Sequence, residues 1–206
     1  MIAINVRGTG GSGKSTLVRR VMGHYRSEPL RREGRRRPLG YHLEGAGASP
    51  LYVPGHYETA CGGCDTIKTP GEVYDLINLA LTDVQGSTGH SYDVLYEGIM
   101  VMDDVRRAVE LDKWLKRMPS GEPLRNRLYV IYLTTPIEEC LAAIRARREA
   151  RGDTRPLDPR NTVDRKRRAE GGLRRLREAG ISVECLSRED AFTRVCGLLR
   201  LTPAAT

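Results

Sequence analysis

The sequence predicts an α/β fold, a three-layer sandwich in which helices cover both faces of a central, mostly parallel β-sheet. Short apolar, strand-like segments alternate along the chain with segments that carry helix signals. Such alternation is typical of βαβ units, whose crossover helices make neighbouring strands parallel. The 206 residues suit one domain, residues 1–206, with a substantial core, and no internal repeat or linker divides them.

The expected strands are runs of apolar or aromatic residues between turn-forming residues. They span residues 2–6, 39–44, 50–56, 92–98, 127–134 and 181–186. The expected helices span residues 14–26, 70–84, 103–117, 136–150, 161–179 and 188–200. Two of these helices follow the pattern Thr-Pro-x-Glu, which starts at Thr69 and at Thr135 and predicts that the threonine caps the helix. The arginine-rich residues 27–38 are expected to form a loop.

The most specific motif is GTGGSGKST, which lies between the first strand and the first helix. It matches the phosphate-binding P-loop (Walker A) pattern G-x-x-x-x-G-K-[ST], in which backbone N–H groups and a helix N-terminus surround phosphate oxygens. Lys14 is expected to reach the β- and γ-phosphates of ATP, and the Ser15 hydroxyl to hold Mg²⁺. The expected nucleotide-binding residues are Gly8, Thr9, Gly10, Gly11, Ser12, Gly13, Lys14, Ser15 and Thr16.

A magnesium site at a P-loop needs an acid, which normally ends a neighbouring strand. Glu97 ends the strand-like segment YDVLYEG and is the candidate for this role. The alternative is an ordinary acid exposed at the end of a strand. A Glu-Gly pair in this position resembles the pattern of nucleoside- and nucleotide-kinase-like P-loop enzymes.

The segment ECLAAIRARREARGDTRP resembles the helix and arginine-rich lid of small P-loop kinases. The resemblance, aligned on Cys140, Leu141 and Ile144, implies a lid of about residues 145–165. It places Arg147 at the lid-arginine position, and Arg151 follows one turn later on the same face. Such arginines stabilise charge on a phosphoryl group in transfer. Three further arginines are alternatives, Arg145, Arg148 and Arg155, and a solvated basic helix without chemistry is another.

The segment GHYETACGGCDT, residues 55–66, allows several interpretations. A Zn²⁺ site would use His56, Cys61 and Cys64, with Asp65 or His42 as the fourth ligand, but no second Cys-x-x-Cys pair completes it. A redox pair would normally lie at a helix start, and the intervening Gly-Gly fits that arrangement poorly. A packed loop without chemistry is a third alternative.

We expect instead a substrate loop, because this segment follows a strand and should lie near the mouth of the P-loop. Asp65 is the first candidate for the general base that accepts the proton of the acceptor hydroxyl, and Glu58 is the second. His56 and Tyr57 are candidates for positioning or stacking on an acceptor ring. The substrate region then spans about residues 27–69.

Charge and cysteine content indicate the class of partner and the compartment. The net charge is +8, and residues 145–177 alone carry thirteen Lys and Arg against five Asp and Glu. A second run, residues 31–37, holds five arginines and one glutamate. These runs are either solvated surfaces or contacts to phosphates. Five cysteines form no disulfide pattern and no segment is apolar enough to span a membrane, so a cytoplasmic protein is expected.

From the P-loop through Glu97 to the arginine lid, the chain looks like a P-loop nucleotide-kinase-like protein. Within that group, its size, charge and segment 55–66 resemble phage kinases that phosphorylate 5-hydroxymethyluracil in DNA during thymidine hypermodification. The resemblance implies ATP and Mg²⁺ as cofactors and DNA as the acceptor. The target base would leave the duplex, and with one Phe and one Trp in the chain its stacking partners would be tyrosines such as Tyr41, Tyr52 and Tyr57.

Two other functions compete with this one. A kinase for a free nucleoside, nucleotide or other small hydroxyl compound would use the same P-loop, acid and lid. A non-enzymatic, NTP-dependent nucleic-acid-binding module would use the P-loop and the charge, but it would not need the lid arginines. The sequence does not determine the oligomeric state.

Overall fold

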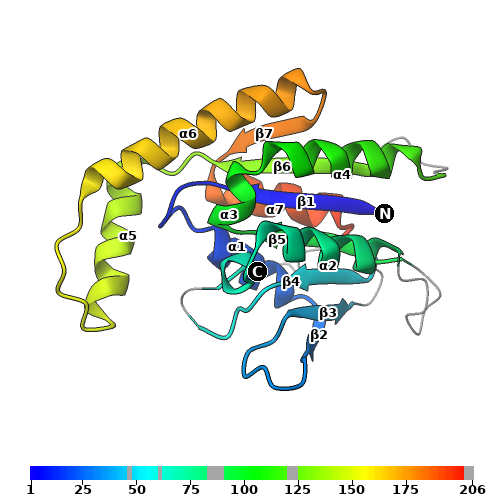
Figure 1. Cartoon of the computed structure of the whole chain (residues 1–206), viewed down its shortest axis with the longest axis horizontal. Coiled ribbons are helices and arrows are strands. Elements are labelled where there is room, and N and C mark those ends of the chain that lie inside the picture. Colours follow the sequence, from blue (N-terminus) through cyan, green and yellow to red (C-terminus); the bar gives the residue numbers. More distant parts are fainter. Residues whose placement is uncertain (46–47, 60–61, 83–90, 120–124, 202–206) are drawn as a thin grey trace.

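Within the described residues, seven strands form one sheet in the order β2-β3-β4-β5-β1-β6-β7 (Figure 1). The computed structural model describes residues 1–45, 48–59, 62–82, 91–119 and 125–201. The strands are β1 (Ile2–Arg7), β2 (Arg26–Leu30), β3 (Gly40–Glu44), β4 (Leu51–Pro54), β5 (Asp93–Glu97), β6 (Arg127–Leu133) and β7 (Ser182–Leu186). The pairs β4–β5, β5–β1, β1–β6 and β6–β7 are parallel, whereas β2–β3 and β3–β4 are antiparallel. The mostly parallel sheet is therefore confirmed.

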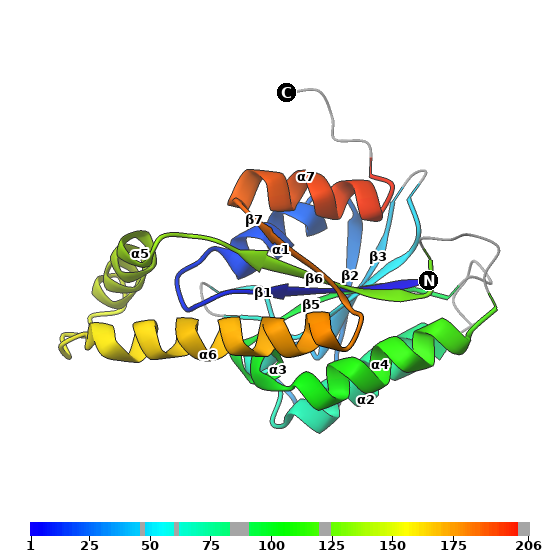
Figure 2. The same cartoon turned by 90° about the horizontal axis from the view of Figure 1, so that it is seen from above.

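Helices cover both faces of this sheet and complete the three layers (Figure 2). Helices α1 (Lys14–Met22) and α7 (Arg188–Leu198) lie on one face. The other face carries α2 (Pro70–Thr82), α3 (Ile99–Asp103), α4 (Val105–Arg117) and α6 (Pro159–Glu178). Helix α5 (Ile137–Glu149) stands at the end of the sheet near the start of α6. A 3₁₀ turn, η1, spans Cys64–Thr66.

Side chains of β1 alternate between the two cores, as the period of a strand requires. Ile2, Ile4 and Val6 join the apolar cluster under α1 and α7. Ala3 joins the cluster under α2, α4 and α6, and the buried polar residues Asn5 and Arg7 point to the same face because they share its register. The central strand is thus buried on both sides, and its carboxyl end leads directly into the P-loop.

Several element boundaries differ from the expectation. Residues 27–38 are not wholly a loop, because Arg26–Leu30 pair with β3 as an exposed edge strand. An edge strand tolerates a proline such as Pro29, which removes one donor from the ladder. The helix expected over 103–117 is α4, which starts at Val105 because the side chain of Asp104 accepts a hydrogen bond from the N–H of Arg107 at 3.0 Å; the short helix α3 before it was not expected.

The two Thr-Pro-x-Glu patterns behave differently. Thr69 caps α2 as expected, because its hydroxyl accepts a hydrogen bond from the N–H of Glu72 at 3.1 Å. The cap expected at Thr135 is wrong. Its hydroxyl donates instead to the carbonyl of Ser12 at 2.8 Å, so this residue ties the start of α5 to the P-loop.

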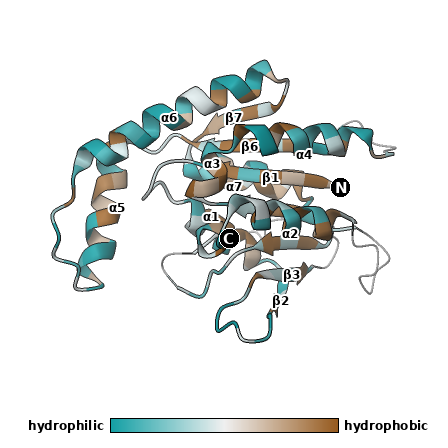
Figure 3. Cartoon of the chain, in the orientation of Figure 1, coloured by the Kyte–Doolittle hydropathy of each residue, from teal (hydrophilic) through white to brown (hydrophobic). Residues whose placement is uncertain are grey.

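Helices α5 and α6 extend beyond the end of the sheet, and much of α6 is strongly hydrophilic (Figure 3). The carboxyl-terminal half of α6 packs on the core through buried residues such as Leu173 and Leu176. Its amino-terminal part therefore reaches solvent together with the arginine-rich turn that precedes it. No helix in the described part of the chain combines the length and the apolar character that crossing a lipid bilayer requires.

Candidate active site

The P-loop lies where β1 passes into α1, at the carboxyl edge of the parallel strands (Figure 1). Gly13 precedes the helix with a φ of 100°, a left-handed conformation that glycine adopts without strain. The backbone N–H groups at the start of α1 are thereby available to phosphate oxygens. Two distant residues fix the loop from outside, because Thr135 and Arg188 both donate to the carbonyl of Ser12.

Lys14 is buried inside this loop, with 7% of its surface exposed. Its ammonium group donates to the carbonyls of Gly8 at 2.8 Å and Thr9 at 2.9 Å. Burial lowers the pKa of Lys14, and the carboxylates of Glu97 and Asp65 oppose that shift. The lysine charge therefore lies between the P-loop and two acids, at the position the motif predicts for contact with phosphates.

Glu97 ends β5, next to β1 in the sheet, and only 2% of its surface is exposed. The hydroxyl of Ser15 donates to its carboxylate at 2.7 Å. Burial raises the pKa of Glu97, while Lys14 and the Ser15 hydrogen bond lower it. A hydroxyl and a carboxylate in contact at a P-loop are the hard oxygen donors that Mg²⁺ prefers, so the residues present fit this ion.

The described residues of the loop after β4, residues 55–59 and 62–66, pack against this pair. His56 and Gly63 exchange backbone hydrogen bonds, which holds these two parts of the loop together. Gly63 has a φ of 77°, and a Cβ at this position would collide with the Glu97 carboxylate. Gly63 is therefore explained by its close approach to Glu97, whereas a Cβ at Gly62 would collide with the carbonyl of His56. The loop forms one wall of the site at the mouth of the P-loop.

Asp65 lies at the end of this wall and is exposed. Its carboxylate accepts hydrogen bonds from the N–H groups of Ile99 at 2.7 Å and Met100 at 3.2 Å, so it caps the amino-terminus of α3. Both bonds use one oxygen, Oδ1. The other oxygen has no hydrogen-bond partner among the described residues, and the carboxylate is close enough to Lys14 and Glu97 to affect both their pKa values.

Two of the three candidate substrate residues are buried, contrary to the expectation that they position or stack on an acceptor ring. His56 is 1% exposed and Tyr57 is 5% exposed, so neither ring presents a face to a ligand in this structure. Tyr41 and Tyr52 are buried as well, and the expected tyrosine stacking platform is therefore wrong. These rings pack in the apolar clusters on either side of the sheet, where their burial stabilises the core. Glu58 is exposed and pairs with Arg31 at 3.2 Å.

The zinc hypothesis concerns Cys61 and Cys64. Cys61 lies outside the described residues. The Cys64 thiol is fully buried against the carbonyl of Pro54, and burial raises its pKa well above the usual range. A protonated thiol is a poor metal ligand. Among the described residues, no group of three or more His, Cys, Asp or Glu side chains is arranged to hold a metal ion.

The lid arginines separate into three groups. Burial is the main cause of the lowered pKa of Lys14, and the charge of Arg147 adds to it, so this guanidinium lies near enough to the P-loop lysine to act on it. Arg148 instead donates to the carbonyls of Arg155 and Pro156 and closes the turn between α5 and α6. Arg155 pairs with Asp153, so two of the three alternatives serve the structure of the lid itself. Arg145, on α5, and Arg151, in the turn that follows it, are exposed.

The arginine run 31–37 folds over the wall loop. Arg31 donates to Glu58, and Arg35 donates to the carbonyl of Thr66 at 2.7 Å, next to Asp65. The charge of Arg37 helps to keep the pKa of His56 low, so this residue also lies close to the wall. The run thus covers the outer side of the substrate region, with Arg32 and Arg36 exposed.

A cavity of about 260 Å³ adjoins the P-loop and was missed by sequence reasoning. Arg188, Glu189 and Phe192 of α7 line it together with Arg20, whose guanidinium lies 3.7 Å from the centre of the Phe192 ring. A planar cation on an aromatic ring offers a flat surface beside the phosphate cradle, which fits a nucleotide base. No local motif marks this pocket, because residues 20 and 188 meet only through the packing of α1 against α7.

Comparison with known proteins identifies a relative of this chain. No family model matches the chain. A curated protein named "5-hmdU DNA kinase", from Pseudomonas phage PaMx11, is 40% identical over 198 residues, which cover 95% of this chain and 96% of that protein. Identity at this level over nearly the full length of both proteins establishes common ancestry. The chain belongs to the family of phage 5-hmdU DNA kinases.

Proposed function

We propose that this chain is an ATP-dependent kinase that transfers the γ-phosphate to the 5-hydroxymethyl group of 5-hydroxymethyluracil in phage DNA, a step of thymidine hypermodification. One observation carries the proposal. In a chain 40% identical to a relative named 5-hmdU DNA kinase, the Ser15–Glu97 pair lies beside Lys14 at the P-loop. Such an enzyme would act in the cytoplasm of the host.

The P-loop residues would hold the nucleotide. Backbone N–H groups at the start of α1 bind the phosphates, and the Lys14 ammonium exchanges its two carbonyl partners for phosphate oxygens. Ser15 and Glu97 would hold Mg²⁺, which when bound neutralises charge on the phosphate oxygens. The cavity between α1 and α7 accommodates the adenine base.

Asp65 and Arg147 would act on the transfer itself. Asp65 takes the proton of the hydroxymethyl group through its second oxygen, while the hydroxyl oxygen forms a bond to the γ-phosphorus. The bond from that phosphorus to the bridging oxygen breaks, and ADP leaves with the electron pair. Arg147 stabilises the negative charge on the phosphoryl group as the lid approaches the P-loop.

DNA would reach this site along the basic arm formed by α5 and α6. A base in a duplex is buried in the stack, so the enzyme must take the target nucleotide out of it. The uncompensated arginines of the arm supply the backbone contacts that such a distortion requires. Because the tyrosine rings are buried, polar contacts from the wall loop are left to recognise the extruded base.

The proposal is tested with γ-labelled ATP and Mg²⁺. DNA that contains 5-hydroxymethyluracil, thymine DNA, and the matching free nucleosides and nucleotides are offered as acceptors, and the label is located after digestion. We expect label on the modified base of the polymer and none with Lys14→Ala, a variant that should fold normally. Label on free nucleosides or nucleotides alone would instead make the chain a small-molecule kinase.

A further inference from the structure

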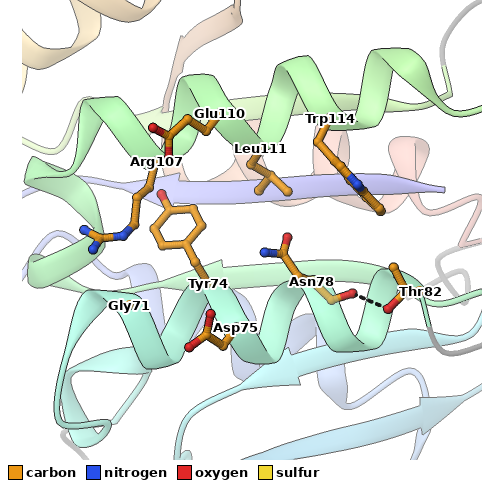
Figure 4. Close-up of a pocket in the computed structure, with 9 residues that line it drawn as sticks. All are labelled: Gly71, Tyr74, Asp75, Asn78, Thr82, Arg107, Glu110, Leu111 and Trp114. Atoms are coloured by element: carbon orange, nitrogen blue, oxygen red, sulfur yellow. Dashed lines mark hydrogen bonds between the residues drawn. The ribbon is translucent and has the colours of Figure 1, made fainter.

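Two surface cavities lie on the face of the sheet that carries α2, α3, α4 and α6. The first is a groove of about 610 Å³ between α2 and α4, into which Tyr74 and Trp114 project (Figure 4). Its charged lining is Asp75 and Glu110 against one arginine, Arg107. This groove therefore has no excess of positive charge and does not suit a phosphate.

The second cavity, about 580 Å³ in volume, lies between α3 and α6, and we call it the α3–α6 notch. It is lined by Met102, Asp103, Arg168, Gly171, Gly172, Arg174 and Arg175. Elsewhere on α6, Lys166 pairs with Glu170, and Arg167 lies 4.0 Å from Asp164. Within the described part of the chain, the guanidinium groups of the three notch arginines have no ion-pair partner.

The single acid of the notch, Asp103, is compensated by the positive charge of Arg7, which is buried and does not line the notch. Asp103 raises the pKa of the buried Arg7, whose pKa burial lowers, so the two opposite charges interact. Arg7 also donates to the carbonyl of Met102 at 2.6 Å and thereby fixes the carboxyl end of α3. The three arginines of α6 are thus left as the uncompensated charge of the notch, which makes it a site for an anion.

Two consecutive glycines in the middle of α6 open the notch. Glycine inside a helix costs about 0.5–1 kcal/mol relative to alanine, so a Gly-Gly pair needs a reason. A Cβ at Gly172 would meet Val105 at an ordinary contact distance of 3.7 Å, whereas no described atom lies within 4 Å of a Cβ at Gly171. Packing therefore does not require Gly171. Its missing side chain instead keeps the cavity accessible beside Arg168 and Arg175.

The notch lies close to the candidate active site. Helix α3 begins directly after Glu97 and Gly98, and Asp65 caps it at Ile99. Asp103, at the other end of this helix, is about 6 Å further along its axis at the usual rise per residue. An anion in the notch would therefore be a near neighbour of the reacting nucleotide.

We propose that the α3–α6 notch binds a backbone phosphodiester of the DNA substrate near the target nucleotide. This inference rests on the proposed function. It assigns one phosphate contact to the notch, where Arg168, Arg174 and Arg175 lie around Gly171. The glycine lets the phosphate approach the helix closely, and the arginines donate to its oxygens. Holding the backbone at this point would fix the register of the strand while the target base enters the active site.

The test compares two glycine substitutions in helices. Gly171→Gln fills the notch, and Gly197→Gln is the matched control in α7, where a Cβ also meets no described atom within 4 Å. Both changes remove a glycine from a helix, so both should raise the midpoint of thermal unfolding. We expect the Kd for duplex DNA containing 5-hydroxymethyluracil to rise about tenfold in Gly171→Gln only, with the KM for ATP unchanged in both.

Charge variants give an independent readout. Arg168→Gln and Arg175→Gln should each lower the slope of log K against log salt by about one. Arg106→Gln, on α4 and paired with Glu110, is the charge-matched control and should leave the slope unchanged. If Gly171→Gln binds DNA with wild-type affinity and Arg175→Gln keeps the wild-type salt slope, the notch does not bind a DNA phosphate. If the wild-type protein binds DNA but transfers no label to it, the proposed function is wrong. The DNA affinities of the glycine variants then still show whether the notch binds a phosphate.

Discussion

The carboxylate of Asp65 caps a helix and is also the candidate general base. One oxygen caps α3, and the charge of the carboxylate acts on the pKa values of Lys14 and Glu97. A cap needs only an acceptor, whereas a general base must also take up a proton. The two roles can therefore be separated by substitutions that keep or remove the acceptor.

Asp65→Asn should keep the cap and lose the base. We expect transfer to fall by about 10²–10⁴-fold with ATP binding and unfolding midpoint close to wild type. Asp65→Ala should lose the same activity and in addition about 1 kcal/mol of stability, because the N–H groups of Ile99 and Met100 lose their acceptor. Single-turnover rates and thermal melts check this. A normal rate in Asp65→Asn would move the base to Glu58 or another residue.

His56 contributes a pH dependence of stability. Burial lowers its pKa, Arg37 adds to this effect, and Glu58 opposes it. The unfolded chain therefore takes up a proton near pH 6.5 that the folded protein does not yet bind. The free energy of unfolding should decrease as the pH falls below about 6.5, until the pH reaches the lowered pKa of the folded state.

His56→Gln should remove this component of the pH dependence, while it keeps a polar partner for Thr59. The difference in stability between wild type and variant, measured by denaturant unfolding from about pH 8 to 5, should be constant above about pH 7. It should change in favour of the variant at lower pH. A constant difference over the whole range would show that His56 is not held neutral by the fold.

At the scale of elements, the arginines of the helical arm formed by α5 and α6 differ in their contacts. Arg148 shapes the turn through its hydrogen bonds to two carbonyls, whereas the charge of Arg147 acts on Lys14 of the P-loop. The distinction follows from the helix, because adjacent residues point about 100° apart and only one of them can face the nucleotide.

Arg147→Gln should reduce kcat by about 10²-fold or more, with the KM for ATP little changed, if its charge acts on the phosphoryl group during transfer. Arg145→Gln removes the same charge from an exposed position on the same helix and should have less than about a twofold effect. Steady-state kinetics of both variants decide the assignment. Equal losses would reduce Arg147 to a general contribution to the charge of the arm.

At the scale of the whole molecule, residues 145–177, which make up most of the arm, carry as much net positive charge as the entire chain. Exposed charge of this kind attracts a polymer of phosphates much more than a single small acceptor. The salt dependence of the reaction therefore reports on the acceptor without knowledge of any single contact.

We expect affinity for DNA to fall by about 10³-fold or more between about 50 and 200 mM salt, if six or more phosphates are contacted. The KM for ATP, which is bound in an enclosed loop, should change less than about twofold over the same range. Fluorescence anisotropy and initial rates measure the two quantities. A DNA affinity that is insensitive to salt would argue for an acceptor other than the polymer.

The sequence by itself determined the parts of this protein that are local. The P-loop, the helix cap at Thr69 and the strand that ends at Glu97 are each encoded within a few neighbouring residues, and the structure places them as expected. The alternation of strands and helices similarly predicted the parallel sheet, because period and connection length are local properties. The individual roles of Asp65 and Arg147 remain predictions.

Only the tertiary structure decided features that depend on contacts between distant segments. Thr135 bonds to Ser12 instead of capping its helix, and Arg188 joins it from α7. The rings of Tyr41, Tyr52 and Tyr57 are buried although their types suit stacking on a base, and Gly63 is required by the position of Glu97. These outcomes depend on which surfaces the folded chain brings into contact, because burial and close approach are properties of packing and leave no periodic trace along the sequence.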